Sequence, residues 1–216
     1  MKGLFRFFIL FAASAGLAQN PSPTAQPPEP YPIKPEPYHI KNDVLGEPIS
    51  VYRQNNPECS DKDPITGSAN FYQAKTTGKW SGTCMALSFD PELPAGKSTP
   101  ITYADISMKA RVASFSEDRW VWIIFTAKHP DYDFLRNNLI AKFGEPTGRA
   151  TEDVQNRMAV HFVGELLTWD NGVSSIHLEE YGDDLDSSSL VFALDDYLKQ
   201  QKPLSKSSPM CRVVVP

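Results

Sequence analysis

The residues best placed by type and spacing to do chemistry are His177 and Glu179. They lie two positions apart in the segment SSIHLEEY, and residues at that spacing share one face of a strand. A histidine and a carboxylate on one face could exchange a proton or bind a metal ion, with His161, Glu165 and Tyr181 as further candidates. A solvated outer strand face explains the same pattern. A hydrolase using His177 and Glu179 is therefore an alternative reading.

A second group of carboxylates, Asp183, Asp184 and Asp186, could offer oxygen ligands to Ca²⁺. Their spacing matches no known calcium loop, and a polar turn between strands is the simpler interpretation. The chain has no Gly-x-Ser-x-Gly elbow, no glycine-rich phosphate loop and no His-Glu-x-x-His motif. We therefore expect a protein that is not an enzyme and that uses neither metal nor cofactor.

Aromatic residues offer a different kind of site. The run RWVWIIFT is typical of a packed strand, and a turn at Glu117 and Asp118 predicts a hairpin with the preceding MKARVASF. That turn places Phe115 opposite Trp120, with both faces of the hairpin apolar, which predicts a central strand covered on both sides. One predicted face carries Phe115, Trp120, Trp122 and Ile124, and the other carries Val112, Val121, Ile123 and Phe125. The alternative to packing is an open binding surface formed by Phe115, Trp120 and Trp122.

The elements around this hairpin follow from apolar spacing. DYDFLRNNLIAKFG predicts a helix, with apolar residues three and four apart and an end at Gly144 and Pro146. A shorter helix carrying Ile49 and Tyr52 is predicted to end near residues 55–57. Asn171-Gly172 predicts a two-residue turn between two strands, pairing Trp169 with Ser174. Further strands are expected at 69–74, 84–89, 149–160 and 188–193, and a closing helix at 195–201.

The N-terminus predicts export. Lys2 and Arg6 precede the apolar segment 7–13, and Gly16 and Ala18 fit a cleavage site, so residues 1–18 are expected to be a signal peptide. Residues 19–37 are rich in proline and predict a tether in front of a single domain, 38–203, with a tail at 204–216. Cleavage removes two basic residues and leaves 19 against 26 acidic ones, a net charge of −7 instead of −5. This acidity argues against nucleic acid as a partner, and no transmembrane span is expected in the mature chain.

The three cysteines stand at 59, 84 and 211. In an exported protein a Cys59–Cys84 disulfide is the leading hypothesis. Cys211 is then left over, and a free thiol, a bond to another chain and competition for Cys59 or Cys84 all remain open. The spacing does not support a metal site formed by the three thiols.

LIAKFGEPT, VQNRM and LLTWDNGVSSIHLEEYGDDLDSSSLVF together resemble a family of uncharacterised secreted bacterial proteins. Its pattern is a Lys-Tyr/Phe-Gly-x-Pro helix stop, a Gln-Asn pair, a Trp-x-Asn-Gly hairpin and a Ser-Ser/Thr-Leu strand, with an upstream Leu-Gly-Glu helix and two cysteines. The resemblance covers most of residues 40–200 and implies no assigned activity. A looser similarity, at the level of fold, is to β-lactamase-inhibitor-like domains, which bind other proteins.

These observations predict an α+β domain, an antiparallel sheet packed by two or three helices. The similarity of Leu45–Pro48 to Phe143–Pro146, 98 residues apart, suggests a weak tandem duplication. The expected function is that of an exported, non-catalytic binding or envelope-interaction module with an unknown protein or small-ligand partner. The alternatives are the hydrolase above and a structural or lipid-facing envelope component. The sequence leaves the oligomeric state open.

Overall fold

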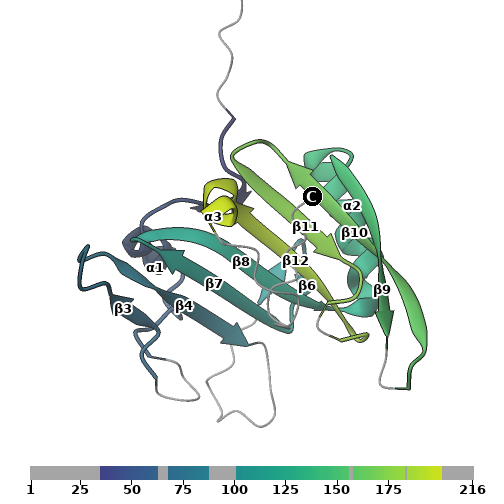
Figure 1. The fold of residues 1–216 in the computed structure, drawn as a ribbon, viewed down its shortest axis with the longest axis horizontal. Coiled ribbons are helices and arrows are strands. Elements are labelled where there is room, and N and C mark those ends of the chain that lie inside the picture. The colour runs from purple at the N-terminus through teal and green to yellow at the C-terminus, as the bar shows by residue number, and fades with distance from the viewer. Residues whose placement is uncertain (1–34, 63–67, 88–100, 156–157, 183, 201–216) are drawn as a thin grey trace, which may run out of the picture. The chain divides into compact units, whose positions relative to one another are not determined.

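The computed structural model describes residues 35–62, 68–87, 101–155, 158–182 and 184–200, and an antiparallel sheet of eight strands dominates them (Figure 1). The strand order across the sheet is β3-β4-β7-β8-β12-β11-β10-β9. β8 and β12 pair with each other at the centre of the sheet. The strands are β3 (Phe71–Gln73), β4 (Trp80–Leu87), β7 (Ala110–Ser116), β8 (Arg119–Lys128), β9 (Gly148–Gln155), β10 (His161–Asp170), β11 (Ser174–Glu179) and β12 (Ser187–Leu194).

Short elements surround this sheet. Two hairpins have strands of only two residues each: β1 (His39–Ile40) with β2 (Asp43–Val44), and β5 (Thr102–Tyr103) with β6 (Ile106–Ser107). The helices are α1 (Ile49–Asn55), α2 (Tyr132–Phe143), which follows a 3₁₀ turn at His129–Asp131, and α3 (Asp195–Gln200). None of the helices in the described ranges is long and apolar enough to cross a membrane.

The expected α+β class is wrong, because the described chain is mainly β. The helices have 7, 12 and 6 residues and are small additions to an eight-stranded sheet. Their apolar spacing made them prominent in the sequence. By contrast the two-residue strands β5 and β6 carry little pattern of their own, although the strand expected at 149–160 is present as β9.

The predicted pairing of β7 with β8 holds at Phe115 and Trp120 but not beyond. A bulge on β8 shifts the register, so that Ser114 pairs with Trp122 and Ala113 with Ile123. Two residues of a bulged strand oppose one on its neighbour, which turns Trp120 toward the face opposite to that of Trp122. Trp120 and the next residue, Val121, are accordingly both buried. The prediction that Phe115, Trp120 and Trp122 all share one face of the sheet is therefore wrong.

One face of the sheet, here called the helix-bearing face, carries α1, α2 and the β5–β6 hairpin (Figure 1). Tyr103 of β5 packs its ring on those of Phe125 and Phe192, and the indole N–H of Trp169 donates to the carbonyl of Gly144 at the end of α2. Cross-strand register places the central apolar residues on this face: Ala113, Ile123, Phe125, Leu167, Trp169, Ile176, Leu178, Leu190 and Phe192.

The expected helices at α1, α2 and α3 are confirmed, as is the hairpin at Asn171-Gly172. Its register differs by two residues, because Asn171 accepts the N–H groups of Val173 and Ser174 with its side-chain oxygen and so widens the loop. Trp169 therefore pairs with Ile176. The predicted signal peptide, nearly all of the tether, the tail and Cys211 lie outside the described residues.

Replacing Trp120 by alanine tests the corrected face. The side chain has 0% exposure, so Trp120→Ala should lower the free energy of unfolding by about 3 to 5 kcal/mol, measured by urea denaturation. Tyr72→Ala is the matched control, because Tyr72 is 65% exposed on β3 and should change the same quantity by less than about 0.5 kcal/mol. Similar small effects for both would contradict the buried position of Trp120.

Candidate functional site

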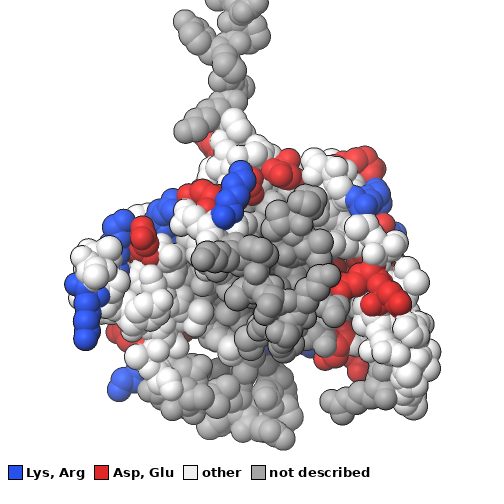
Figure 2. All heavy atoms as spheres, in the orientation of Figure 1, with Lys and Arg blue, Asp and Glu red and all other residues white. Residues whose placement is uncertain are grey.

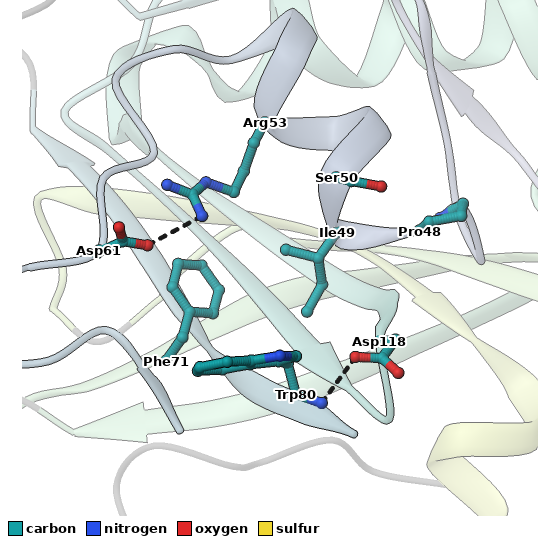
Figure 3. Close-up of a pocket in the computed structure, with 8 residues that line it drawn as sticks. All are labelled: Pro48, Ile49, Ser50, Arg53, Asp61, Phe71, Trp80 and Asp118. Atoms are coloured by element: carbon teal, nitrogen blue, oxygen red, sulfur yellow. Dashed lines mark hydrogen bonds and ion pairs between the residues drawn. The ribbon is translucent and has the colours of Figure 1, made fainter. Parts of the chain in front are cut away.

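A cleft of about 320 Å³ opens between α1 and the β3–β4 hairpin (Figure 3). It lies on the helix-bearing face, near the edge of the sheet formed by β3. Figure 3 shows helix residues on one wall and aromatic rings on the other. The lining residues are Pro48, Ile49, Ser50, Arg53, Asp61, Phe71, Trp80 and Asp118. This volume is at the lower end of the range for small-ligand pockets.

Trp80 is the exposed aromatic residue of this cleft. The residue is 46% exposed, whereas the neighbouring Phe71 is almost fully buried. The main chain of Trp80 is held by the β7–β8 turn, since its N–H donates to Oδ1 of Asp118 at 2.7 Å and its carbonyl accepts the N–H of Asp118. Lys79 and Glu117 add an ion pair between the same two segments. The exposed indole therefore sits on a fixed backbone.

The charged groups of the cleft are already engaged. The guanidinium of Arg53 pairs with Asp61 at 2.9 Å, donates through Nε to the carbonyl of Cys59 at 3.1 Å, and lies 5.5 Å from the ring centre of Phe71. Such a cation over an aromatic face is favourable. The result is a cleft whose guanidinium and carboxylate neutralise each other at the rim, beside an apolar floor.

A second, more open hollow of about 580 Å³ adjoins the cleft. The two share Ser50, Arg53 and Asp61, so the Arg53–Asp61 ion pair stands at the wall between them. The remaining lining residues of the second hollow are Gln54, Pro57, Cys59 and Ser60. A partner seated over both hollows would contact this ion pair.

Main-chain hydrogen bonds seat the start of α1 on the sheet. The N–H of Gly46 donates to the carbonyl of Trp120 at 2.8 Å, and the N–H of Trp120 donates back to Glu47 at 2.9 Å. The N–H of Ile49 donates to the carbonyl of Asp118. Gly46 has φ +93°, a left-handed conformation that side-chain-bearing residues rarely adopt. The segment that leads into α1 therefore pairs with β8 like an additional short strand.

The buried side of α1 is anchored by Tyr52. Its ring centre lies 5.1 Å from that of Phe115 and 4.9 Å from that of Trp120. Burial raises the pKa of the Tyr52 hydroxyl well above its ordinary value, so the ring stays neutral at every physiological pH. This aromatic cluster fixes the distance between the helix and the sheet, and hence the width of the cleft.

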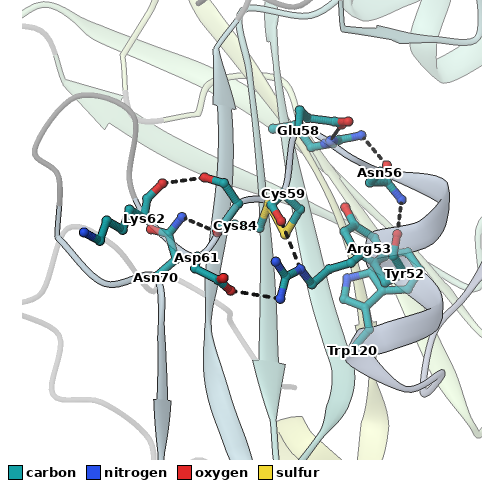
Figure 4. Close-up of a disulfide and its surroundings, with 12 residues drawn as sticks. Tyr52, Arg53, Asn56, Glu58, Cys59, Asp61, Lys62, Asn70, Cys84 and Trp120 are labelled. Atoms are coloured by element: carbon teal, nitrogen blue, oxygen red, sulfur yellow. Dashed lines mark hydrogen bonds and ion pairs between the residues drawn. A yellow bond between two sulfur atoms is a disulfide. The ribbon is translucent and has the colours of Figure 1, made fainter.

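The end of α1 is held by polar contacts and by a disulfide (Figure 4). Asn55 and Asn56 donate to the two carboxylate oxygens of Asp43, and Arg111 donates to the side-chain oxygen of Asn56 at 2.9 Å and pairs with Glu58. The predicted bond between Cys59 and Cys84 is confirmed, with 5.4 Å between the Cα atoms. It joins the segment after α1 to β4.

The structure separates the three aromatic residues that the sequence suggested as a binding surface. Phe115 and Trp120 are buried, at 2% and 0% exposure, beneath α1. Trp122 is half-buried, packs against the core and lies on the other face of the sheet. They are therefore not one exposed surface. Phe115 and Trp120 instead form the support on which α1, a wall of the cleft, rests.

The candidates for a hydrolase site are divided between the two faces of the sheet. His177 and Glu179 stay together on one face of β11, and Glu165 lies on the other, helix-bearing face. His177 is half-buried, with Nε2 3.1 Å from the Ser175 hydroxyl and Nδ1 3.3 Å from the Thr168 hydroxyl. Glu165 bonds to Tyr132 and pairs with Arg136 and Arg149.

The remaining candidates lie elsewhere. His161, at the start of β10, pairs with Asp153 on β9, and Tyr181 stacks on His129. None of the five candidates lines the cleft. Among the described residues, no group of three or more histidines, cysteines and carboxylates is arranged to hold a metal ion.

A scan against protein-family models and searches of the curated proteins and of the solved structures each found no match. The site is therefore defined by this chain's own geometry. Sequence reasoning missed it, although one signal was present: Trp80 is an isolated tryptophan in the polar stretch KTTGKWSGT. A large aromatic residue without apolar neighbours is a better candidate for surface contact than one within an apolar run.

Loss of the disulfide should destabilise the domain. The bond closes a loop of 25 residues, so the Cys59→Ser/Cys84→Ser double variant should unfold with a free energy lower by about 3 kcal/mol. Urea denaturation of the oxidised wild type and the double variant measures this difference, and the reduced wild type is the control. Equal stability of the oxidised and reduced forms would contradict a stabilising role.

The stability should depend on the protonation of His177. Burial lowers the pKa of this ring from 6.5, opposed by the charge of Asp170, so the unfolded chain binds the proton more readily than the folded one. Stability should therefore be greatest above pH 6.5 and fall as the pH decreases through 6.5 toward the folded-state pKa. His177→Gln should remove part of this loss in urea titrations at several pH values. Exposed His161 supplies the control, His161→Gln. An equal acid loss in the wild type and His177→Gln would contradict the prediction.

Proposed function

We propose that this protein is an exported, non-catalytic binding module whose cleft between α1 and β3–β4 holds an apolar or aromatic side chain of a partner protein. The observation that carries the proposal is the exposed indole of Trp80 beside the buried ring of Phe71, in a cleft held by a disulfide. Tryptophan is among the residues that contribute most to protein interfaces, especially where a rigid pocket surrounds it.

The composition of the cleft supports a side-chain ligand. Ile49, Phe71 and Trp80 offer apolar contact, and the Arg53–Asp61 ion pair at the rim offers polar partners to a peptide backbone. Because the guanidinium and the carboxylate are paired, the cleft does not demand a charged ligand. Its volume of about 320 Å³ suits a single large side chain with part of its backbone.

Rigidity also supports binding. Main-chain hydrogen bonds, the Tyr52 cluster and the disulfide hold α1 in place, so the walls of the cleft are fixed before a ligand arrives. This lowers the entropic cost of association. Export is part of the proposal. The disulfide is typical of oxidising compartments, and the N-terminal sequence predicts a cleaved signal peptide.

Selection from a library of random linear peptides displayed on phage tests this proposal, with the oxidised protein as bait. Selected peptides should share an aromatic or large aliphatic residue. Their affinity, measured by titration calorimetry, should fall by at least about tenfold in Trp80→Ala, the effect of removing one interface anchor.

Tyr72→Ala is the matched control, because Tyr72 is an exposed aromatic on the same hairpin but lies outside the cleft lining. It should leave the affinity unchanged. Peptides that bind the wild type and Trp80→Ala equally well, or a selection that enriches no peptide, would contradict the proposed function.

A further inference from the structure

Among the described residues, β9 is the long edge strand of the sheet, with no strand paired on its outer side. The strand order begins with β3, which has three residues, and ends with β9, which has eight. An edge strand presents a row of unpaired N–H and C=O groups that can accept another strand. The open edge of β9 is therefore a template for pairing.

The outer part of this edge has fewer partners in the rest of the sheet, although the Tyr181 ring packs against Phe162. β11 pairs with β10 only at Leu166–Asp170, so β9 and β10 continue as a two-stranded ribbon at Thr151–Gln155 and His161–Glu165 (Figure 1). Val163 on this ribbon is 70% exposed. Figure 2 shows the opposite face of the sheet, on which the end of this hairpin carries few charged side chains. A ribbon of two strands is marginally stable alone, and an additional strand would stabilise it.

Hydrogen bonds on the far side of β10 identify which residues of β9 face outward. The N–H of Glu165 donates to the Glu180 carboxylate at 2.9 Å, and the carbonyl of Glu165 accepts the N–H of Glu180. Both main-chain groups of Glu165 thus point away from β9. Thr151 pairs with Glu165, and in such a non-hydrogen-bonded antiparallel pair the groups of the partner also point away. The N–H and C=O of Thr151 therefore face the open edge, as do those of Arg149 and Asp153 by alternation.

We propose that β9 pairs antiparallel with β9 of a second copy of this chain, about a two-fold axis at Thr151. The two Thr151 residues then exchange both N–H···O bonds across the axis. Arg149 of each copy lies directly opposite Asp153 of the other, which makes two symmetric pairs of opposite charge on the helix-bearing face. The interface is isologous and closed, and it joins the two eight-stranded sheets into one.

Charge favours this register over the one whose axis lies at Glu152. An axis at Glu152 would place that carboxylate opposite its own copy, an unfavourable pair of like charges. The side chains of Arg149 and Asp153 are exposed enough to form the new pairs. Arg149 already pairs with Glu145 and Glu165, but a guanidinium has five N–H donors and a carboxylate has several acceptor sites, so each can add a partner.

The exposed aliphatic residue on the ribbon fits the same arrangement. Val163 is the cross-strand neighbour of Asp153 on β10 and shares its face. In the dimer Arg149 of the second copy lies opposite Asp153. The aliphatic stem of this arginine would lie toward Val163 and reduce the exposure of the Val163 side chain. The proposed dimer thus covers apolar surface and also gives hydrogen-bond partners to the main-chain groups at the edge of β9.

Sedimentation equilibrium of the oxidised exported chain tests the proposal. The wild type should sediment as a dimer, and Thr151→Pro should weaken the dimer by at least about tenfold because it removes the two N–H donors at the axis. Thr151→Val, which keeps the N–H, is the matched control and should remain dimeric. Because the Thr151 N–H serves no bond inside the sheet, both variants should keep the circular dichroism spectrum of the wild type.

A charge exchange provides the second readout. Asp153→Arg should dissociate the dimer by placing like charges together, and the double variant Arg149→Asp/Asp153→Arg should restore it by reversing each pair. A wild type that is monomeric at all concentrations, or a dimer that persists in both Thr151→Pro and Asp153→Arg, would overturn the proposal. Trp80→Ala should stay dimeric, so the test is independent of the proposed cleft function.

Discussion

The packing of Tyr52 on Trp120 and Phe115 is the contact on which the cleft depends. It fixes α1 above the edge of the helix-bearing face, and the main-chain bonds of Gly46 and Ile49 align the helix along β8. The disulfide then ties the segment after the helix to β4. A helix of 7 residues is too short to be stable alone, so tertiary contacts determine its position.

The bulge on β8 makes this packing available. In a regular strand Trp120 would share the face of Trp122, away from α1, because residues two apart point the same way. With it, two successive residues, Trp120 and Val121, enter the core, and α1 gains an aromatic support. The position of the cleft is thus a consequence of one irregularity in strand pairing, and the exposed Trp80 lies where the covering by α1 ends.

These relations explain what the sequence could predict. Apolar spacing identified α1 and α2, and Asn171-Gly172 located the hairpin, whose register moved by two residues, so that each side chain kept its face. The cysteine count and the expected export identified the disulfide. The bulge has no signature in an apolar run, so it could not be predicted, whereas the strand expected at 149–160 corresponds to β9. The cleft escaped prediction because Arg53, Asp61 and Trp80 are brought together only by the disulfide and the sheet.

Hydrogen exchange of the Trp120 indole N–H, followed by NMR in the oxidised and the reduced protein, tests the central claim most directly. The N–H donates to the carbonyl of Trp122 at 3.0 Å in the buried cluster beneath α1. If the disulfide holds α1 over this cluster, reduction should accelerate exchange at Trp120 by at least about tenfold, the effect of a local opening. Trp169, bonded to Gly144 far from the disulfide, should change little. Equal protection of Trp120 in both forms would contradict the account.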